Sequence, residues 1–146
     1  MRVQELRKLT RLRLITCGPN DRLRHVAGLL SDEQIGAMPV VEPGGRMVGI
    51  ISERDICHAL ADHGDRTASL MVSDIMTCDV AVCELHESVQ DVITRMSQRR
   101  IRHLPIVDDG KLVGMVSLRD VLEATLREVR LEANVLRDYA RTLAFS

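Results

Sequence analysis

An internal repeat constrains the fold of this chain more than any other feature. The stretch over residues 35–56 returns, with similar residues at most positions, over residues 101–121. Pro39 corresponds to Pro105 at an offset of 66, and positions after the glycine-containing turn correspond at 65. Hairpin loops tolerate such changes of length. The pattern therefore predicts two copies of one supersecondary unit.

Both copies show the same predicted order of elements, β-α-β-β-α. Apolar residues at three-and-four spacing indicate an amphipathic helix over 23–30 and 89–96, with Asp21 and Ser88 as candidate N-caps. Two apolar strands joined by a glycine-containing turn follow each helix and favour a hairpin. The other expected elements are short first strands near residues 14–17 and 80–83, and second helices that start at Ser52 and Ser117.

One copy alone is a marginal folding unit, because about 60 residues bury only a modest fraction of their surface. Two copies can cover one another, which predicts an α+β fold of two repeats packed with pseudo-two-fold symmetry. The expected division is 1–68 for the N-terminal segment and first repeat, 69–127 for the second repeat, and 128–146 for a helical extension. Clefts at such junctions are common ligand sites.

Composition argues against several classes of function. With 20 Lys and Arg against 21 Asp and Glu, the net charge of −1 gives no pull toward nucleic acid or anionic membrane. Tyr139 and Phe145 are the only aromatic residues, so ring stacking on single-stranded nucleic acid is not expected, and the core must use aliphatic residues and Met. The N-terminus lacks a signal peptide and no apolar run approaches the roughly 20 residues of a membrane span, so a cytoplasmic protein is expected.

The sequence also lacks motifs for catalysis or metal binding. Its four cysteines form no Cys-x-x-Cys pair, so buried reduced thiols are expected. The five histidines lack metal-site spacing, and neither a P-loop nor a Gly-x-Gly-x-x-Gly loop occurs. Cys57 and His58 are neighbours on a predicted helix and point in different directions. We therefore expect no enzyme, no metal and no required cofactor.

The paired motifs resemble the tandem cystathionine-β-synthase (CBS) domain pair, also called a Bateman module. Over residues 10–127, each copy has a Pro followed by two apolar residues, a glycine turn, and a Val-Gly strand that ends in Ser-x-x-Asp. The chain is similar in architecture to small stand-alone bacterial CBS-pair proteins. The resemblance implies two pseudo-equivalent sites between the repeats for an adenosine-containing ligand, with AMP, ADP, ATP, NAD(H) and S-adenosylmethionine as candidates.

The same resemblance implies that Ser-x-x-Asp supplies ribose and phosphate contacts, here through Ser52 and Asp55 and through Ser117 and Asp120. An ionised Asp in the first turn of a helix can accept hydrogen bonds from both ribose hydroxyls, and the free N–H groups there suit a phosphate. The spacing is also close to that of a capping box, in which Ser and Asp satisfy backbone donors with no ligand. Both interpretations remain open.

Arginines distinguish the two copies. The second copy carries Arg95, Arg99, Arg100 and Arg102 before His103, whereas the first has no charge at the corresponding place. We expect Arg102 and His103 to reach the phosphates of a ligand bound by Ser117 and Asp120, which would make that site the tighter one. For Arg95 and Arg99 a solvated helix face is the favoured interpretation.

By analogy with the family, aliphatic side chains and backbone line the purine slots. The candidates are Ile35, Gly36 and Met38 from the first copy and Ile101 and Leu104 from the second, and Arg119 completes the candidate ligand-binding set. Gly36 would permit close approach of a flat ring. The aliphatic residues suit a core equally well. Residues 15–19 match the family pattern for the first strand but residues 81–85 do not, so hydroxyl contacts from that strand are not expected in the second copy.

The C-terminal segment carries an apolar seam. Its residues recur at 4-3-4-3-4-3 spacing: Leu122, Leu126, Val129, Ala133, Leu136, Ala140 and Leu143. This spacing predicts one helix over about 119–143, whose seam is covered by the module's own surface or a second chain, and we expect a homodimer. At the other end, residues 2–9 are predicted to form a short helix that packs through Leu6 and Leu9.

Two functions fit these features. The leading hypothesis is a non-catalytic sensor of an adenine nucleotide such as AMP, ATP or NADH, which signals energy or redox state to a protein effector. The alternative is a ligand-independent dimeric scaffold, in which the Ser-x-x-Asp motifs are helix caps and the C-terminal seam is the functional surface.

Overall fold

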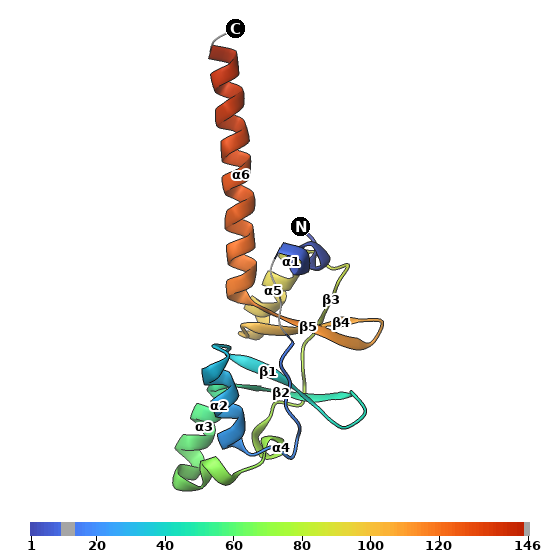
Figure 1. Ribbon diagram of the computed structural model, residues 1–146, viewed down its shortest axis with the longest axis vertical. Coiled ribbons are helices and arrows are strands. Elements are labelled where there is room, and N and C mark those ends of the chain that lie inside the picture. Colours follow the sequence, from blue (N-terminus) through green and yellow to red (C-terminus); the bar gives the residue numbers. More distant parts are fainter. Residues whose placement is uncertain (10–13, 145–146) are drawn as a thin grey trace.

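Two β-hairpins lie next to each other at the centre of the computed structural model, which describes residues 1–9 and 14–144 (Figure 1). The first hairpin joins β1 (Ala37–Val41) to β2 (Met47–Ser52), and the second joins β4 (His103–Asp108) to β5 (Lys111–Ser117). A short strand, β3 (Cys83–Glu84), pairs in parallel with β4 and extends the second hairpin to three strands.

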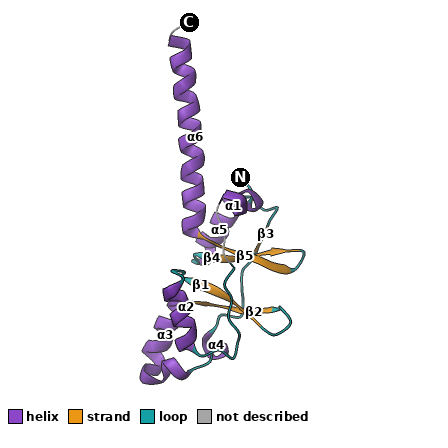
Figure 2. Ribbon diagram, viewed as in Figure 1, coloured by secondary structure: helices purple, strands orange, loops and turns teal. Residues whose placement is uncertain are grey.

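Helices cover the outer side of each hairpin, so that the strands form the inner layers (Figure 2). The first repeat has α2 (Leu23–Asp32) and α3 (Glu53–His63), and the second has α5 (Val89–Arg99) and α6 (Leu118–Ala144). The remaining helical elements are α1 (Val3–Leu9), the 3-10 helix η1 (Gly64–Ser69) and α4 (Val72–Ile75). This α+β architecture of two repeats and a long last helix confirms the predicted fold.

The strand pairing shows that the two repeats are equivalent. Cys17 forms a parallel bridge with Val40, and Cys83 forms the corresponding parallel pair with Ile106. Each hairpin also has a bulge one step further along its first strand. The order β-α-β-β-α is confirmed, although the expected first strands shrink to a single bridge in the first repeat and to two residues in the second.

The predicted N-caps are correct for one of the two first helices. The Ser88 hydroxyl caps α5 by accepting a hydrogen bond from the Asp91 N–H at 3.1 Å. In the first repeat the N-cap of α2 is Arg22, and the Asp21 carboxylate instead accepts from the Gly18 N–H at 2.8 Å. The prediction for Asp21 is wrong because that side chain closes the turn before the helix.

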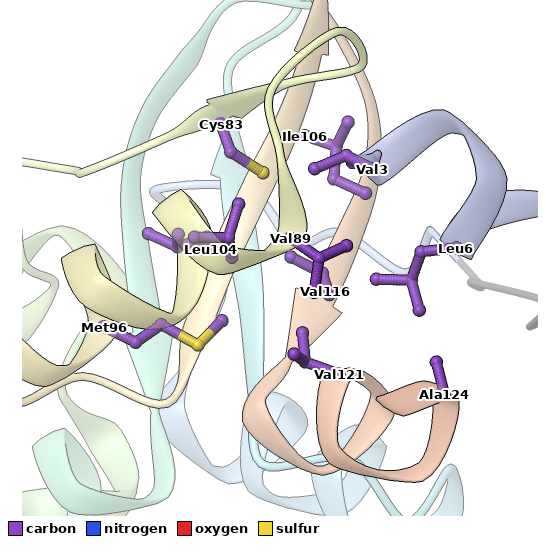
Figure 3. Close-up of a cluster of buried hydrophobic side chains, with 11 residues drawn as sticks. Val3, Leu6, Cys83, Val89, Met96, Leu104, Ile106, Val116, Val121 and Ala124 are labelled. Atoms are coloured by element: carbon purple, nitrogen blue, oxygen red, sulfur yellow. The ribbon is translucent and has the colours of Figure 1, made fainter. Parts of the chain in front are cut away.

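Each repeat encloses its own aliphatic core. The first core contains Cys17, Leu23, Val26, Leu30, Met38, Val40, Ile51, Ala59 and Val72. The second contains Val3, Leu6, Cys83, Val89, Val92, Met96, Leu104, Ile106, Val116, Val121 and Ala124 (Figure 3). As expected, methionine and aliphatic side chains fill both cores. Phe145 lies outside the described residues.

The N-terminal segment packs on the second repeat, which was not expected. Helix α1 forms as predicted, but its Val3 and Leu6 belong to the second core, and the Val3 N–H donates to the Glu87 carbonyl at 2.9 Å. This packing differs from the expected division at residue 68, which places the N-terminal segment with the first repeat. The side chain of Leu9, also expected to pack here, lies outside the described residues.

The linker between the repeats, which runs from α4 to Ala81, packs on the first repeat. Val72 of α4 is fully buried in the first core, and Thr77 pairs with Ile50 of β2 through two backbone hydrogen bonds of 2.9 Å. A Cβ atom added at Gly49 would lie 2.9 Å from the Thr77 carbonyl oxygen, so this close crossing requires glycine. The linker is thereby held against the first hairpin at the boundary between the repeats.

The thiols differ in their surroundings. Cys17 and Cys83 are buried, and burial raises the pKa of each to about 12. Cys57 and Cys78 are exposed, contrary to the expectation that all four thiols are buried. All four are free cysteines. Within the described residues, no helix is sufficiently long and apolar to cross a bilayer.

Candidate functional site

Two cavities open between the repeats, and each contains one Ser-x-x-Asp motif. The Asp55 cavity has a volume of about 620 Å³ and the Asp120 cavity about 810 Å³, both within the range of small-molecule sites. Four residues, Gly36, Ala37, Arg102 and His103, line both. The two cavities therefore meet at one boundary, formed by the start of β1 and the start of β4.

Asp55 combines a capping role with an available carboxylate oxygen. Its Oδ2 accepts hydrogen bonds from the Ser52 N–H and the Ser52 hydroxyl, both at 2.9 Å, while the Asp55 N–H donates to Ser52 Oγ at 3.3 Å. These bonds form a complete capping box at the start of α3. The other oxygen, Oδ1, accepts a hydrogen bond from the Thr77 hydroxyl at 3.4 Å, and both residues line the cavity.

Asp120 repeats this geometry at the start of α6. Its Oδ2 accepts from the Ser117 N–H at 3.0 Å and from the Ser117 hydroxyl at 2.8 Å, and the Asp120 N–H donates to Ser117 Oγ at 3.1 Å. No described residue donates to its Oδ1. Both motifs are thus helix caps, and in both the cap uses one carboxylate oxygen and leaves the second for another donor.

Each cavity combines the cap of one repeat with the turn of the other. The Asp55 cavity receives residues 99–103, which lead from α5 into β4 of the second repeat. The Asp120 cavity receives residues 34–37, which lead from α2 into β1 of the first. Gln34 and Arg100 occupy the same left-handed position in these turns, each with φ of 54°. One turn therefore presents an amide where the other presents a guanidinium.

Because the arginine-containing turn of the second repeat lines the Asp55 cavity, cations are concentrated there. Its lining includes Arg54, Arg99, Arg100 and Arg102, together with the acids Glu53, Asp55 and Asp79. Arg99 lies 3.9 Å from Asp79. The Asp120 cavity has Arg102 and Arg119 against Asp120 and Glu123, and the Arg119 guanidinium is already 3.1 Å from the Glu123 carboxylate. An anionic ligand therefore finds more unpaired positive charge beside Asp55.

His103 stands at the boundary between the two cavities. Its ring lies so close to Gly36 that an added Cβ atom there would be 2.9 Å from His103 Cε1. Burial lowers the pKa of His103 below its ordinary value, against the opposing effects of Asp120 and Glu53, while Arg102 lowers it further. The imidazole is accordingly neutral near pH 7 and can donate from one ring nitrogen while accepting at the other.

Most of the predicted site residues line a cavity. Ile101 lines the Asp55 cavity, while Ile35 and Arg119 line the Asp120 cavity. Met38 and Leu104 line neither, because both side chains point into the cores and are fully buried. Arg95 is also elsewhere: its guanidinium pairs with Glu87 and donates to the Val82 carbonyl, and this hydrogen bonding lowers the pKa of Glu87.

Several lining residues were not predicted from sequence. The linker contributes Thr77, Asp79, Val80 and Ala81 to the Asp55 cavity, and α6 contributes Leu122 and Leu126 to the Asp120 cavity. Thr77 supplies a hydroxyl beside the Asp55 carboxylate and lies four residues before the expected first-strand segment at 81–85. The position of Thr77 between the two repeats is the sequence signal that could have indicated a place in the cavity.

The lining favours a ligand with an apolar part, hydrogen-bonding groups and negative charge. Aliphatic side chains such as Ile50, Val80 and Ile101 supply apolar surface in the Asp55 cavity, and among the described residues no Phe, Tyr or Trp lines either cavity. Nor does any group of three or more His, Cys, Asp and Glu in the described chain form a metal site. The arrangement suits binding through a carboxylate, hydroxyls and guanidinium groups.

Comparison with known proteins agrees with this arrangement. The CBS domain family model matches the chain twice, over residues 3–62 and 72–127. The CBS domain-containing protein YhcV of Bacillus subtilis is 36% identical over 106 residues, which cover 73% of this chain and 74% of that protein. Against several other curated relatives the chain spans less than two thirds of their length.

Two solved structures resemble the whole two-repeat body. A CBS domain pair in complex with 5′-methylthioadenosine and S-adenosyl-L-methionine has a TM-score of 0.75 and 30% identity, and the match covers 86% of this chain and 99% of that one. A CBS domain protein from Pyrobaculum aerophilum, complexed with AMP, has a TM-score of 0.72 and 28% identity over 82% of this chain and 89% of that one. With both repeats matched in sequence and in structure, the chain belongs to the CBS domain family.

Proposed function

We propose that this chain is a non-catalytic regulatory module that binds an adenosine-containing ligand between its repeats and signals its presence to a protein effector. The observation that carries the proposal is the composition of each cavity, which joins the helix start of one repeat to the turn of the other. A ligand in either cavity contacts both repeats. The adenosine ligands of the two similar structures support this choice of ligand class.

In the Asp55 cavity, the chemistry of the lining assigns a role to each part of the ligand. Asp55 Oδ1 accepts hydrogen bonds from the ribose hydroxyls, beside Thr77. Arg100 and Arg102 bind the phosphates, because guanidinium groups match phosphate oxygens in charge and geometry. The adenine packs on aliphatic side chains such as Ile101, with backbone groups to recognise its edge.

We assign the tighter site to the Asp55 cavity, which reverses the order expected from the sequence. That expectation paired Arg102 and His103 with Asp120 of the same repeat, whereas both residues border both cavities and Arg100 lies on the Asp55 side. The Asp120 cavity is then a second, weaker site. Its ligand contacts come from Ser117 and Asp120 and from the lining residues Ile35, Gly36 and Arg119.

Regulation follows from the position of the ligand between the repeats. A ligand shifts an equilibrium only as far as its affinities for the two states differ, so one that contacts both repeats favours the arrangement in which both sets of contacts form. AMP, ADP and ATP would report energy state, NAD(H) redox state, and S-adenosylmethionine the supply of that metabolite. In this proposal the module is a cytoplasmic homodimer, and no cofactor is required for folding.

Thermal unfolding in the presence of AMP, ATP, NADH and S-adenosylmethionine tests the proposal. A ligand at 100 times its Kd adds about 2.7 kcal/mol to the stability of the native state, which amounts to a rise in Tm of roughly 5–10 °C for a chain of this size. We expect such a rise with at least one of these ligands. Unchanged Tm values at millimolar concentrations of all four would contradict the proposal.

The capping boxes favour one competing function. Because both are complete without any ligand, the Ser-x-x-Asp motifs could serve the fold alone, and the chain would then be a dimeric scaffold that acts through α6. Substituting Asp55 by Asn separates the two functions, since an amide oxygen can still accept the cap bonds. A sensor binds its ligand more weakly in this variant and shows a smaller ligand-induced Tm shift, whereas a scaffold shows no such shift in either protein.

A further inference from the structure

The outer part of α6 carries a seam that the body does not cover. The seam consists of Leu122, Leu126, Val129, Ala133, Leu136, Ala140 and Leu143, and every residue from Leu126 to Ala144 is exposed. Figure 1 shows this part of the helix extending away from both repeats. Helices in proteins owe most of their stability to packing of an apolar face, so a helix that projects in this way requires a partner along the seam.

The seam fits another helix better than the second apolar row of α6 does. Its seven positions contain no charged residue, and the 4-3 spacing places them at the a and d positions of three heptads. The second row, Leu131, Val135 and Tyr139, is also exposed, but Glu128 lies in line with it at helical spacing. The seam is therefore the surface along which two helices would pack.

The charged residues beside the seam favour a second copy of α6 as the partner and a parallel orientation of the two helices. With Ala133 at an a position, Glu132 occupies g, and Arg130 and Arg137 occupy e. In a parallel pair of α6 helices, Glu132 faces the partner subunit's Arg137, and symmetry forms this pair twice. In an antiparallel pair that overlaps the whole seam, e faces e and g faces g, so Arg130 faces the partner's Arg137 and Glu132 has no opposite charge. A shift by one heptad would place Glu123, which also occupies e, opposite the partner's Arg137, but Glu123 is already paired with Arg119 of its own chain.

We propose that α6 forms a parallel two-stranded coiled coil with a second copy of this chain, in the register that pairs Glu132 with the partner's Arg137. Apolar seams with charged flanks at this spacing are the pattern of coiled coils, and the same helix supplies both complementary flanks. The coil starts beside the Asp120 cavity, because Leu122 and Leu126 belong to both. The variants used as tests therefore lie from residue 131 onward.

Sedimentation of two leucine variants tests whether the seam is the interface. Leu131 and Leu136 are exposed to a similar degree, at 65% and 68%, and lie in the same helix, but only Leu136 belongs to the seam. We expect the unmodified chain and Leu131→Asp to sediment as dimers at micromolar concentration and Leu136→Asp as a monomer. A monomeric unmodified chain, or equal disruption by both variants, would overturn the proposal.

Charge reversal tests the direction and register. Arg137→Glu places two acids opposite each other at both copies of the pair, so we expect the dimer to weaken about tenfold. Adding Glu132→Arg restores the opposite charges and should restore the affinity in a parallel coil. If the double variant is no tighter than Arg137→Glu alone, the parallel register is wrong.

A disulfide introduced at the seam gives a second readout. In a background with Cys57→Ser and Cys78→Ser, Ala140→Cys places two thiols at the same level of a parallel coil, within disulfide distance. We expect rapid cross-linking of this variant under mild oxidation and none of Asn134→Cys, which lies on the outer face. In an antiparallel coil the two introduced thiols lie far apart along the helices, so absence of cross-linking would contradict the proposal.

Discussion

The Asp55 and Asp120 cavities have the same helix caps but different surroundings. In both, Ser and Asp close a capping box that leaves one carboxylate oxygen for a further donor. The turn opposite the cap carries Arg100 in one cavity and Gln34 in the other, at the same left-handed position. A duplicated unit can therefore keep its folding signals in both copies while the binding properties of its two sites diverge.

The linker adds a second difference between the halves. It crosses the first hairpin so closely that the carbonyl oxygen of Thr77 would lie 2.9 Å from a Cβ atom at Gly49, whereas the nearest atom to a Cβ at Gly114 would be Ile106 Cδ1 at 3.5 Å. The two glycines occupy equivalent positions in β2 and β5. Gly49 is required because a neighbouring backbone leaves no space for a Cβ atom, whereas a Cβ atom at Gly114 would make only an ordinary contact with a side chain.

The largest expected effect in this comparison is on stability. We expect Gly49→Ala to lower the free energy of unfolding by about 1–3 kcal/mol, the usual cost of forcing extra atoms into a packed site. Gly114→Ala should be within about 0.5–1 kcal/mol of neutral, because alanine restricts the unfolded chain and has space in the strand. Urea denaturation of both variants measures the difference, and equal losses would show that the linker does not confine Gly49.

The next effect concerns the charge of the ligand. Arg100→Gln copies into the Asp55 cavity the residue that stands opposite Asp120, and we expect it to weaken ATP binding about tenfold, since a hydrogen bond to a charged group contributes roughly 1.5–3 kcal/mol. Adenosine has no phosphate, so its affinity should be unchanged. Calorimetry with both ligands provides the measurement.

Arg46→Gln is the matched control, because Arg46 is exposed in the turn of the first hairpin and lines neither cavity. If Arg46→Gln weakens ATP binding as much as Arg100→Gln does, long-range charge explains the effect. A specific phosphate contact by Arg100 would then be excluded.

The smallest effect is a pH dependence at the boundary of the two cavities. Because the pKa of His103 lies below its ordinary value of about 6.5, the unfolded chain binds this proton more readily than the folded one. Stability should therefore rise as the pH rises toward 6.5, and this contribution should be lost as the pH falls below it. Asp120 and Glu53 oppose the shift and Arg102 adds to it.

His103→Gln removes the titrating group and keeps a polar side chain against Gly36. We expect the stability of this variant to change less between pH 5 and 6.5 than that of the unmodified chain, by under about 1 kcal/mol. Urea denaturation over pH 5–8 provides the comparison. Parallel profiles for the two proteins would mean that His103 does not titrate in a distinct environment.

Local sequence patterns predicted most of the fold because each pattern occurs in both copies of the repeat. The hairpins, the caps at Ser52, Ser88 and Ser117, and the long last helix follow from spacing and residue type within short windows. Helix α1 was also predicted, yet its packing on the second repeat was not. A short apolar pattern indicates that a helix must dock but does not indicate the core that accepts it.

The same limit explains the outcome for the candidate site. Ser52, Asp55, Ser117 and Asp120 were found because a repeated motif marks them, and the structure places them in the two cavities. Sequence could not show that each cavity takes its turn from the opposite repeat, since that depends on how the two halves pack. Met38 and Leu104 illustrate a related difficulty, because strand residues with the same apolar character line either a slot or a core.

Calorimetric titration of AMP into Asp55→Asn and Asp120→Asn distinguishes the two cavities, because each substitution removes the charge of one capping carboxylate and retains an oxygen for the helix cap. We expect Asp55→Asn to weaken AMP binding at least tenfold and Asp120→Asn to change it less. A greater loss in Asp120→Asn, or no binding of AMP to the unmodified chain, would contradict the assignment of the Asp55 cavity as the tighter nucleotide site.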